Sequence, residues 1–138
     1  MATARGKRTH ASGKIDVRKY EPSTYDRPAE GPSLVRIHVE EDFGGDIEGS
    51  GVAEFLQTAH SESEASFVGV ERVTGSVAGH AGTFVLQDAG TVNDNTVSGT
   101  WFVVPGSGTG ELQGLRGEGG FTATLGQSAD ITLDYWFE

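Results

Sequence analysis

The 138-residue sequence contains no cysteine, a single methionine and only four prolines. Without cysteine the chain can have no disulfide framework, no thiolate nucleophile and no zinc site of the cysteine type. The four histidines are scattered and show neither HxH nor HExxH spacing, so we expect no metal site. They are His10, His38, His60 and His80.

The chain also lacks a long hydrophobic run. No segment approaches the roughly 18 apolar residues of a membrane helix. The first ten residues, MATARGKRTH, are basic and lack the apolar core of a signal peptide. We therefore expect a cytoplasmic protein with no membrane partner. Its length predicts one domain with its own core over residues 11–138, preceded by a flexible basic tail over residues 1–10.

Positive charge is scarce beyond residue 19. Residues 1–19 contain six basic residues and one acidic residue, a net charge of +5. The rest of the chain contains four basic and nineteen acidic residues, a net charge of −15. A body this acidic repels phosphate backbones, so we do not expect nucleic acid as a partner.

Glycine, by contrast, is abundant, with 21 residues, and short runs rich in Val, Phe, Thr and Ile lie between the glycines. This pattern predicts short strands separated by turns. The connections are mostly short, which favours antiparallel pairing, and all four prolines are expected in connections. The expected strands are residues 12–20, 34–43, 48–59, 64–75, 81–92, 96–104, 116–125 and 129–138.

A row of antiparallel strands with no helices to cover it must hide its edges. At this size, closure of the sheet is the usual solution, and such a barrel can hold one small ligand. We therefore predict an all-β fold, a closed and mostly antiparallel barrel of about eight strands. An eight-stranded sandwich is the competing architecture.

The glycine-rich stretch Val103–Ala123 looks at first like a phosphate-binding loop. Its glycines do not have the G-x-G-x-x-G spacing, because the third position after Gly108 is Glu111. No lysine occurs after Lys19, so a P-loop is excluded. The stretch is better explained as turn chemistry, with one helical turn in ELQGL whose Leu112 and Leu115 plug one end of a barrel.

The segment GSGTGELQGLRGEGGF resembles the glycine-rich segment of the allene oxide cyclase and dirigent barrels. Residues 43–138 are similar to a family of small bacterial proteins of unknown function with an allene-oxide-cyclase-like barrel. The similarity is carried by FGGDIEGSGVAEFL, ASFVGVERVTG, GTFVLQDAGT, GTWFVVPGSGTGELQGLRGEGGF and TLDYWFE. This resemblance implies a barrel and leaves the reaction open. Relatives in the wider superfamily bind small apolar molecules, and some guide or catalyse cyclisation.

Two carboxylates lie on strands whose two faces are both largely apolar. Glu54 lies between Val52 and Leu56, and Glu71 follows Phe67 and Gly69 on its face. In an apolar lumen either carboxylate could act as a general acid or base with a raised pKa. The structural alternative is that Glu54 or Glu71 pairs with Arg72 or Arg116 across strands. His38, on a polar face, is expected to be solvated.

The candidate ligand-binding residues are Phe67, Gln87, Trp101 and Tyr135, because aromatic rings can line an apolar pocket. The alternative for these aromatics is core filling. Because the outer face of the middle strands is also apolar, we expect a homo-oligomer, a dimer or a trimer.

The leading functional hypothesis is a barrel that binds an apolar or amphipathic small molecule in its lumen. The first alternative is a cofactor-free cyclase or isomerase, with Glu54 or Glu71 assisting proton transfer. The second is a filled barrel that acts as an oligomeric interaction module. Whether the protein is an enzyme stays open, and no cofactor is expected.

Overall fold

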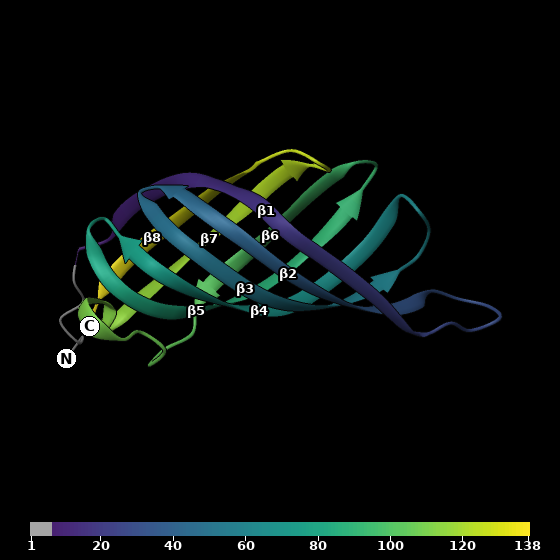
Figure 1. Ribbon diagram of the computed structural model, residues 1–138, viewed down its shortest axis with the longest axis horizontal. Coiled ribbons are helices and arrows are strands. Elements are labelled where there is room, and N and C mark those ends of the chain that lie inside the picture. Colours follow the sequence, from purple (N-terminus) through teal and green to yellow (C-terminus); the bar gives the residue numbers. More distant parts are fainter. Residues whose placement is uncertain (1–6) are drawn as a thin grey trace.

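The computed structural model describes residues 7–138, which form a closed barrel of eight antiparallel strands (Figure 1). Strand order follows chain order, and β8 closes the sheet by pairing with β1. The prediction of an all-β closed barrel is therefore confirmed, and the sandwich alternative is wrong. The elements are β1 Thr9–Asp26, β2 Ser33–Gly45, β3 Ile47–Ala59, β4 Glu64–Val77, β5 His80–Asn93, β6 Thr96–Val103, the 3₁₀ helix η1 Gly110–Leu112, β7 Leu115–Thr124 and β8 Ala129–Phe137.

The first strand differs most from its prediction. β1 was expected over residues 12–20, but it spans 18 residues and runs through Pro22, which pairs with Ile37 of β2. Pro22 was expected in a connection, and that prediction is wrong. β8 pairs only with residues 9–15 of β1, so beyond Ile15 the strand has a free edge where a missing N–H costs no ladder bond. Pro28, Pro32 and Pro105 do lie in connections.

The expected flexible tail, residues 1–10, lies mostly outside the described residues. Thr9 and His10 belong to β1 and pair with Tyr135 and Asp134 of β8. Among residues 7–138, no helix is long and apolar enough to cross a membrane.

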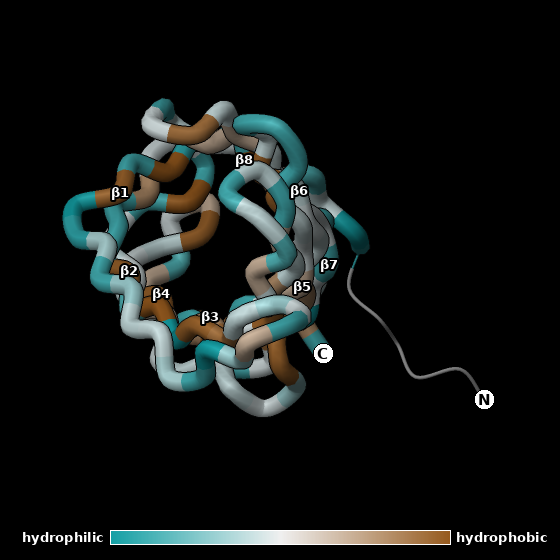
Figure 2. The backbone as a smooth tube through the Cα atoms, turned by 90° about the vertical axis from the view of Figure 1, so that its right-hand side faces the viewer, coloured by the Kyte–Doolittle hydropathy of each residue, from teal (hydrophilic) through white to brown (hydrophobic). Residues whose placement is uncertain are grey.

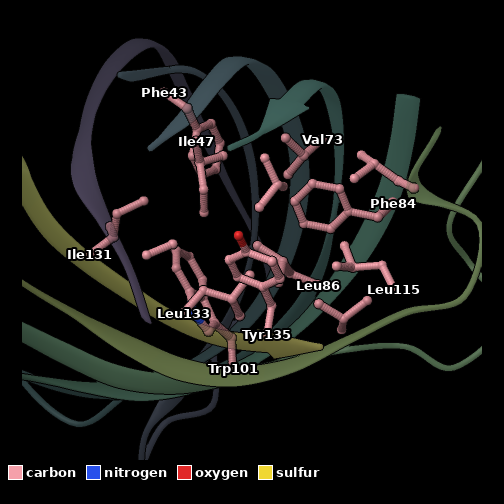
Figure 3. Close-up of a cluster of buried hydrophobic side chains, with 14 of the residues drawn as sticks. Phe43, Ile47, Val73, Phe84, Leu86, Trp101, Leu115, Ile131, Leu133 and Tyr135 are labelled. Carbon is pink, nitrogen blue, oxygen red and sulfur yellow. The ribbon is translucent and has the colours of Figure 1, made fainter. Parts of the chain in front are cut away.

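Side chains alternate between the lumen and the outside along each strand. Most of the buried, inward-facing apolar side chains form one core cluster at one end of the barrel (Figure 3), and a second, smaller cluster consists of Val35, Ile37, Val39 and Ala53. At the centre of the larger cluster lie Phe84, Leu86 and Leu133, all with no exposed surface. Tyr135 belongs to the same cluster, and its hydroxyl points into the interior (Figure 3).

The connection between β6 and β7 seals this end. Its 3₁₀ helix η1 carries Leu112 inward, and both Leu112 and Leu115 are fully buried in the core cluster. Thr109 anchors the connection to β5: its backbone N–H donates to the carbonyl of Thr83 at 2.9 Å, and its Oγ1 accepts from the N–H of Thr83 at 3.0 Å. The predicted plug is confirmed.

The opposite end carries the β1–β2, β3–β4, β5–β6 and β7–β8 connections. Figure 2 views the molecule from this end, with the strands encircling the lumen. No plug comparable to η1 is found here within residues 7–138. The barrel is therefore a cup, sealed at one end and open at the other.

Candidate functional site

The open end of the barrel leads into a cavity of about 1040 Å³. The β7–β8 turn, Leu125–Ser128, forms part of its mouth, and Val92 and Val97 line it near the β5–β6 turn. Deeper residues come from six strands and are mainly apolar or aromatic. They include Ile15, Ile37, Val39, Phe55, Phe67, Trp101 and Phe121. A cavity of this size and lining fits a small organic molecule.

Aromatic rings form one wall of the cavity. Phe67 of β4 and Phe121 of β7 approach each other with ring centroids 6.2 Å apart, although two strands separate them. They can do so because glycines occupy the strands between: a Cβ at Gly90 would overlap the Phe67 ring, and one at Gly99 would overlap the Phe121 ring. Trp101 continues the wall at 5.2 Å from Phe121.

Three carboxyl groups enter the same lumen from neighbouring strands. Glu41 lies on β2, Glu71 on β4 and Asp88 on β5, and all three line the cavity. Their exposed fractions are 7%, 1% and 3%, and they are the only buried polar or charged residues within residues 7–138. The local sequence explains this position, because each carboxyl occupies an inward-facing place in an alternating strand, as in Val39–Glu41–Phe43.

The space for the Glu71 carboxylate comes from β3. Gly51 lies opposite Glu41 in the ladder, and a Cβ at Gly51 would overlap Oε2 of Glu71. That oxygen is buried and has no hydrogen-bond partner among the described residues, and the same holds for Oδ1 of Asp88. Buried polar atoms are normally paired, so these two oxygens require an explanation.

Burial controls the protonation of the cluster. It raises the pKa of Glu71 well above its usual value, and the hydrogen bond with Glu41 and the charges of Glu41 and Asp88 raise it further. Burial also raises the pKa of Glu41, although the hydrogen bond with Glu71 opposes this shift. For Asp88, burial and then the charge of Glu41 raise the pKa to about 7. The cluster therefore holds protons at neutral pH that ordinary carboxylates would have lost.

The mouth of the cavity has its own polar groups, which are already paired. The Nζ of Lys14 donates to Asp130, and the hydroxyl of Ser128 donates to Asp16. Both pairs are exposed. Among residues 7–138, Lys14 is the one basic side chain in the cavity lining, and its ammonium is committed to Asp130.

The predicted site residues divide between the two faces of the barrel. Glu71, Phe67 and Trp101 line the cavity. Tyr135 faces inward but belongs to the core cluster of the sealed end. Gln87 and Glu54 both lie on the outer face, where Gln87 is exposed and Glu54 is half-buried. Both border a shallow outer hollow.

Glu54 has partners on that outer face. Nε of Arg36 donates to Glu54 Oε1 at 3.0 Å, and Nδ1 of His38 contacts the other carboxylate oxygen. His38 also reaches Glu40 at 2.8 Å, and the hydrogen bonds with Glu40 and then Glu54 raise the pKa of His38. His38 therefore lies on the polar face as expected, within an ion-pair network. The proposed cross-strand partners Arg72 and Arg116 are not those of Glu54. Neither arginine pairs with the buried Glu71: Arg72 is exposed on the outer face, and Arg116 pairs with Glu138 at 2.8 Å.

Sequence reasoning missed Glu41 and Asp88. The signal was present, because Glu41 follows Val35, Ile37 and Val39 on an apolar strand face, and Asp88 follows Phe84 and Leu86. Glu54 gives the same signal between two apolar residues, yet it faces outward. Which apolar face is internal depends on barrel closure and cannot be read from one strand.

Comparisons with known proteins agree with this fold. A family model described as a protein of unknown function (DUF3224) matches residues 11–135. A crystal structure of a DUF3224-family protein of unknown function from Shewanella oneidensis MR-1 is similar, with 31% sequence identity and a TM-score of 0.80. The match covers 96% of this chain and 99% of that one. A search of curated proteins found no match.

Proposed function

The chain belongs to DUF3224, a family of proteins of unknown function, and we propose its function from the lumen because this membership names no activity. We propose that the barrel binds one small apolar or amphipathic molecule. The supporting observation is the cavity of about 1040 Å³, which is open at one end and combines aromatic walls with a few polar groups at its floor. This combination is typical of small-molecule sites.

The three carboxyl groups support an amphipathic ligand in particular. A purely structural lumen would gain stability from apolar side chains at these positions, since burying a carboxyl without a partner is costly. Oε2 of Glu71 and Oδ1 of Asp88 have no hydrogen-bond partner within the described residues 7–138. A polar group of the ligand would supply the missing partner while its apolar part fills the aromatic half of the cavity.

A second function, a cofactor-free isomerase or cyclase acting in the lumen, is favoured by the Glu41–Glu71 pair. Two carboxyls within hydrogen-bonding range can share one proton, so one group can donate a proton while the other accepts one. In this mechanism the cavity would fold the substrate into a reactive conformer, and Glu71 would move the proton. Glu71→Gln would then abolish turnover and spare binding, whereas Glu54→Gln on the outer face would spare both.

The binding function is tested first on the protein purified from its own host. Native mass spectrometry reveals a co-purifying molecule, and thermal-shift screening against apolar and amphipathic metabolites follows. We expect a rise of several degrees with at least one class of ligand, because a ligand at 100 times its Kd stabilises a protein by about 2.7 kcal/mol.

A matched pair of variants locates the binding. Ala123→Trp places a large ring in the cavity lining, whereas Thr122→Trp places the same ring on the outer face of the same strand. Ala123→Trp should abolish the ligand-induced rise in unfolding temperature, and Thr122→Trp should retain it. Ligand binding would be contradicted if the native mass equals that of the polypeptide alone and no compound of a broad library raises the unfolding temperature. That result would favour the interaction-module alternative.

A further inference from the structure

We propose that the ligand carries a cation, most simply a protonated amine, which binds at the Glu41–Glu71–Asp88 floor of the lumen. This inference rests on the proposed binding function and adds the chemical class of the ligand. It is carried by three buried carboxyl groups, by the orphaned oxygens of two of them and by the lack of an internal counter-charge.

No basic side chain of residues 7–138 reaches the floor of the cavity. Lys14 lies at the mouth and is paired with Asp130. The arginines beyond residue 20 are all outside: Arg36 pairs with Glu54, Arg116 pairs with Glu138, and Arg27 and Arg72 are exposed. A negative charge that forms on the floor therefore has no positively charged partner within the described part of the protein.

The ionisable groups around the cavity determine the sign of its charge. β2, β4 and β5 contribute one carboxyl each, at Glu41, Glu71 and Asp88; β3, β6 and β7 contribute none to the lining. At the mouth, Asp16 and Tyr20 of β1 and Asp130 of β8 add no positive charge beyond that of Lys14. Once Asp88 has ionised, an anionic ligand would meet like charge, whereas a cation would neutralise the floor.

The cavity also offers a cation two hydrogen-bond acceptors and a neighbouring aromatic ring. Glu71 is 1% exposed and lines the cavity, and its Oε2, which has no hydrogen-bond partner among residues 7–138, lies in the space left by Gly51. Oδ1 of Asp88 is the second free acceptor, and Asp88 lies beside Trp101 in the β5–β6 ladder. An ammonium group has three donors and no acceptor, so it matches two free acceptor oxygens, and the faces of aromatic rings also attract cations.

Three probes of one shape test the proposal: 4-phenylbutylamine, 4-phenylbutan-1-ol and 4-phenylbutanoate. Their binding to the full chain is measured by isothermal titration calorimetry between pH 6 and pH 8. At pH 8 we expect the amine to bind at least tenfold more tightly than the alcohol, and the carboxylate to show no binding. The amine's affinity should rise about tenfold from pH 6 to pH 8, because Asp88 ionises around pH 7 in the free protein. The alcohol's affinity should stay nearly constant.

Variants assign the effect to the floor. Glu71→Gln and Asp88→Asn should each lower the affinity for the amine at least tenfold and change the affinity for the alcohol less than threefold. Glu54→Gln is the matched control, since it makes the same substitution on the outer face, and it should leave the affinity for the amine within twofold of the parent value. Circular dichroism and the retained binding of the alcohol confirm that each variant is folded.

The outcomes separate this inference from the proposed function. If the alcohol or the carboxylate binds as tightly as the amine, the lumen binds ligands but the cation assignment is wrong. If the amine binds and neither floor variant weakens it, the cation lies elsewhere and the assignment is also wrong. If none of the three probes binds at millimolar concentration, both the assignment and the proposed function are contradicted.

Discussion

At the scale of single residues, the cost of the acidic floor should appear in the pH dependence of stability. The pKa of Asp88 is raised to about 7 in the folded barrel, above its ordinary value of 3.8. Between about pH 4 and pH 7 the folded state therefore holds a proton that the unfolded chain has already released. Asp88 is only 3% exposed, so little solvent screening reduces this effect.

The predicted result is a protein that is more stable at pH 5 than at pH 8. For a carboxyl shifted from 3.8 to about 7, linkage gives a loss of about 2–3 kcal/mol in the free energy of unfolding between these two pH values. Asp88→Asn should remove most of this loss. Urea denaturation of both proteins between pH 5 and pH 8 measures this loss. If the free energy of unfolding of Asp88→Asn falls with pH as much as that of the parent protein, Asp88 is not the cause.

The outer network supplies a control for this experiment. His38 has a raised pKa, so its pairs with Glu40 and Glu54 also stabilise the protein at low pH and weaken as pH rises through the folded pKa of His38. The side chain of His38 is 30% exposed, and solvent screening makes this contribution small. His38→Gln should therefore retain most of the pH dependence that Asp88→Asn removes.

At the scale of elements, the 3₁₀ helix η1 determines which end of the barrel is closed. Leu112 projects from η1 into the core and has no exposed surface. Leu112→Ala should lower the free energy of unfolding by about 2–5 kcal/mol, because the rigid barrel cannot fill the space that is left. Denaturant unfolding measures this cost.

Leu125 provides the comparison at the open end. It is 51% exposed in the β7–β8 turn, so Leu125→Ala should change stability by less than about 0.5 kcal/mol. Equal costs for the two substitutions would mean that η1 does not seal the barrel. A selective cost at Leu112 would confirm that the two ends differ in packing, as a cup requires.

The sequence predicts these elements well where their signal is local. Glycine-bounded β-rich runs place all eight strands, and the spacing of Leu112 and Leu115 predicts the plug. β1 is longer than predicted because β2 supports it beyond the barrel and its free edge tolerates Pro22. A sequence pattern that treats proline as a strand terminator cannot detect an edge that exists only after closure.

The candidate site is less predictable for the same reason. Glu54 and Glu71 both interrupt an apolar strand face, but only closure of the barrel makes the face of Glu71 internal. The floor also needs β2, β4 and β5 to bring Glu41, Glu71 and Asp88 together. Such non-local convergence leaves no spacing motif in the chain.

At the scale of the whole molecule, the outer face of β3–β6 is unusual for a solvated surface. Five of its apolar side chains are 41–55% exposed: Val52, Leu56, Val68, Val70 and Phe102. Most of them line a shallow hollow of about 970 Å³, bordered by Arg36 on one side and by Glu118 and Asp134 on the other. We propose that a second copy of the chain covers this face across a two-fold axis, which would bring Arg36 of each copy toward the acidic border of the other.

This arrangement predicts a dimer of twice the 14.5 kDa chain mass at micromolar concentration, measured by size-exclusion chromatography with light scattering. Val70→Glu should yield monomers, because it places a charge in the centre of the apolar face, where Val70 is 49% exposed. Tyr25→Glu, at a position on β1 that is 58% exposed and lies away from this face, should leave the dimer intact. A monomeric parent protein would contradict the interface, and a mass of three chains would replace the two-fold arrangement with a ring. Since Val70 points away from the lumen, the Val70→Glu monomer should still bind the amine probe, so that assembly and ligand binding can be measured independently on one molecule.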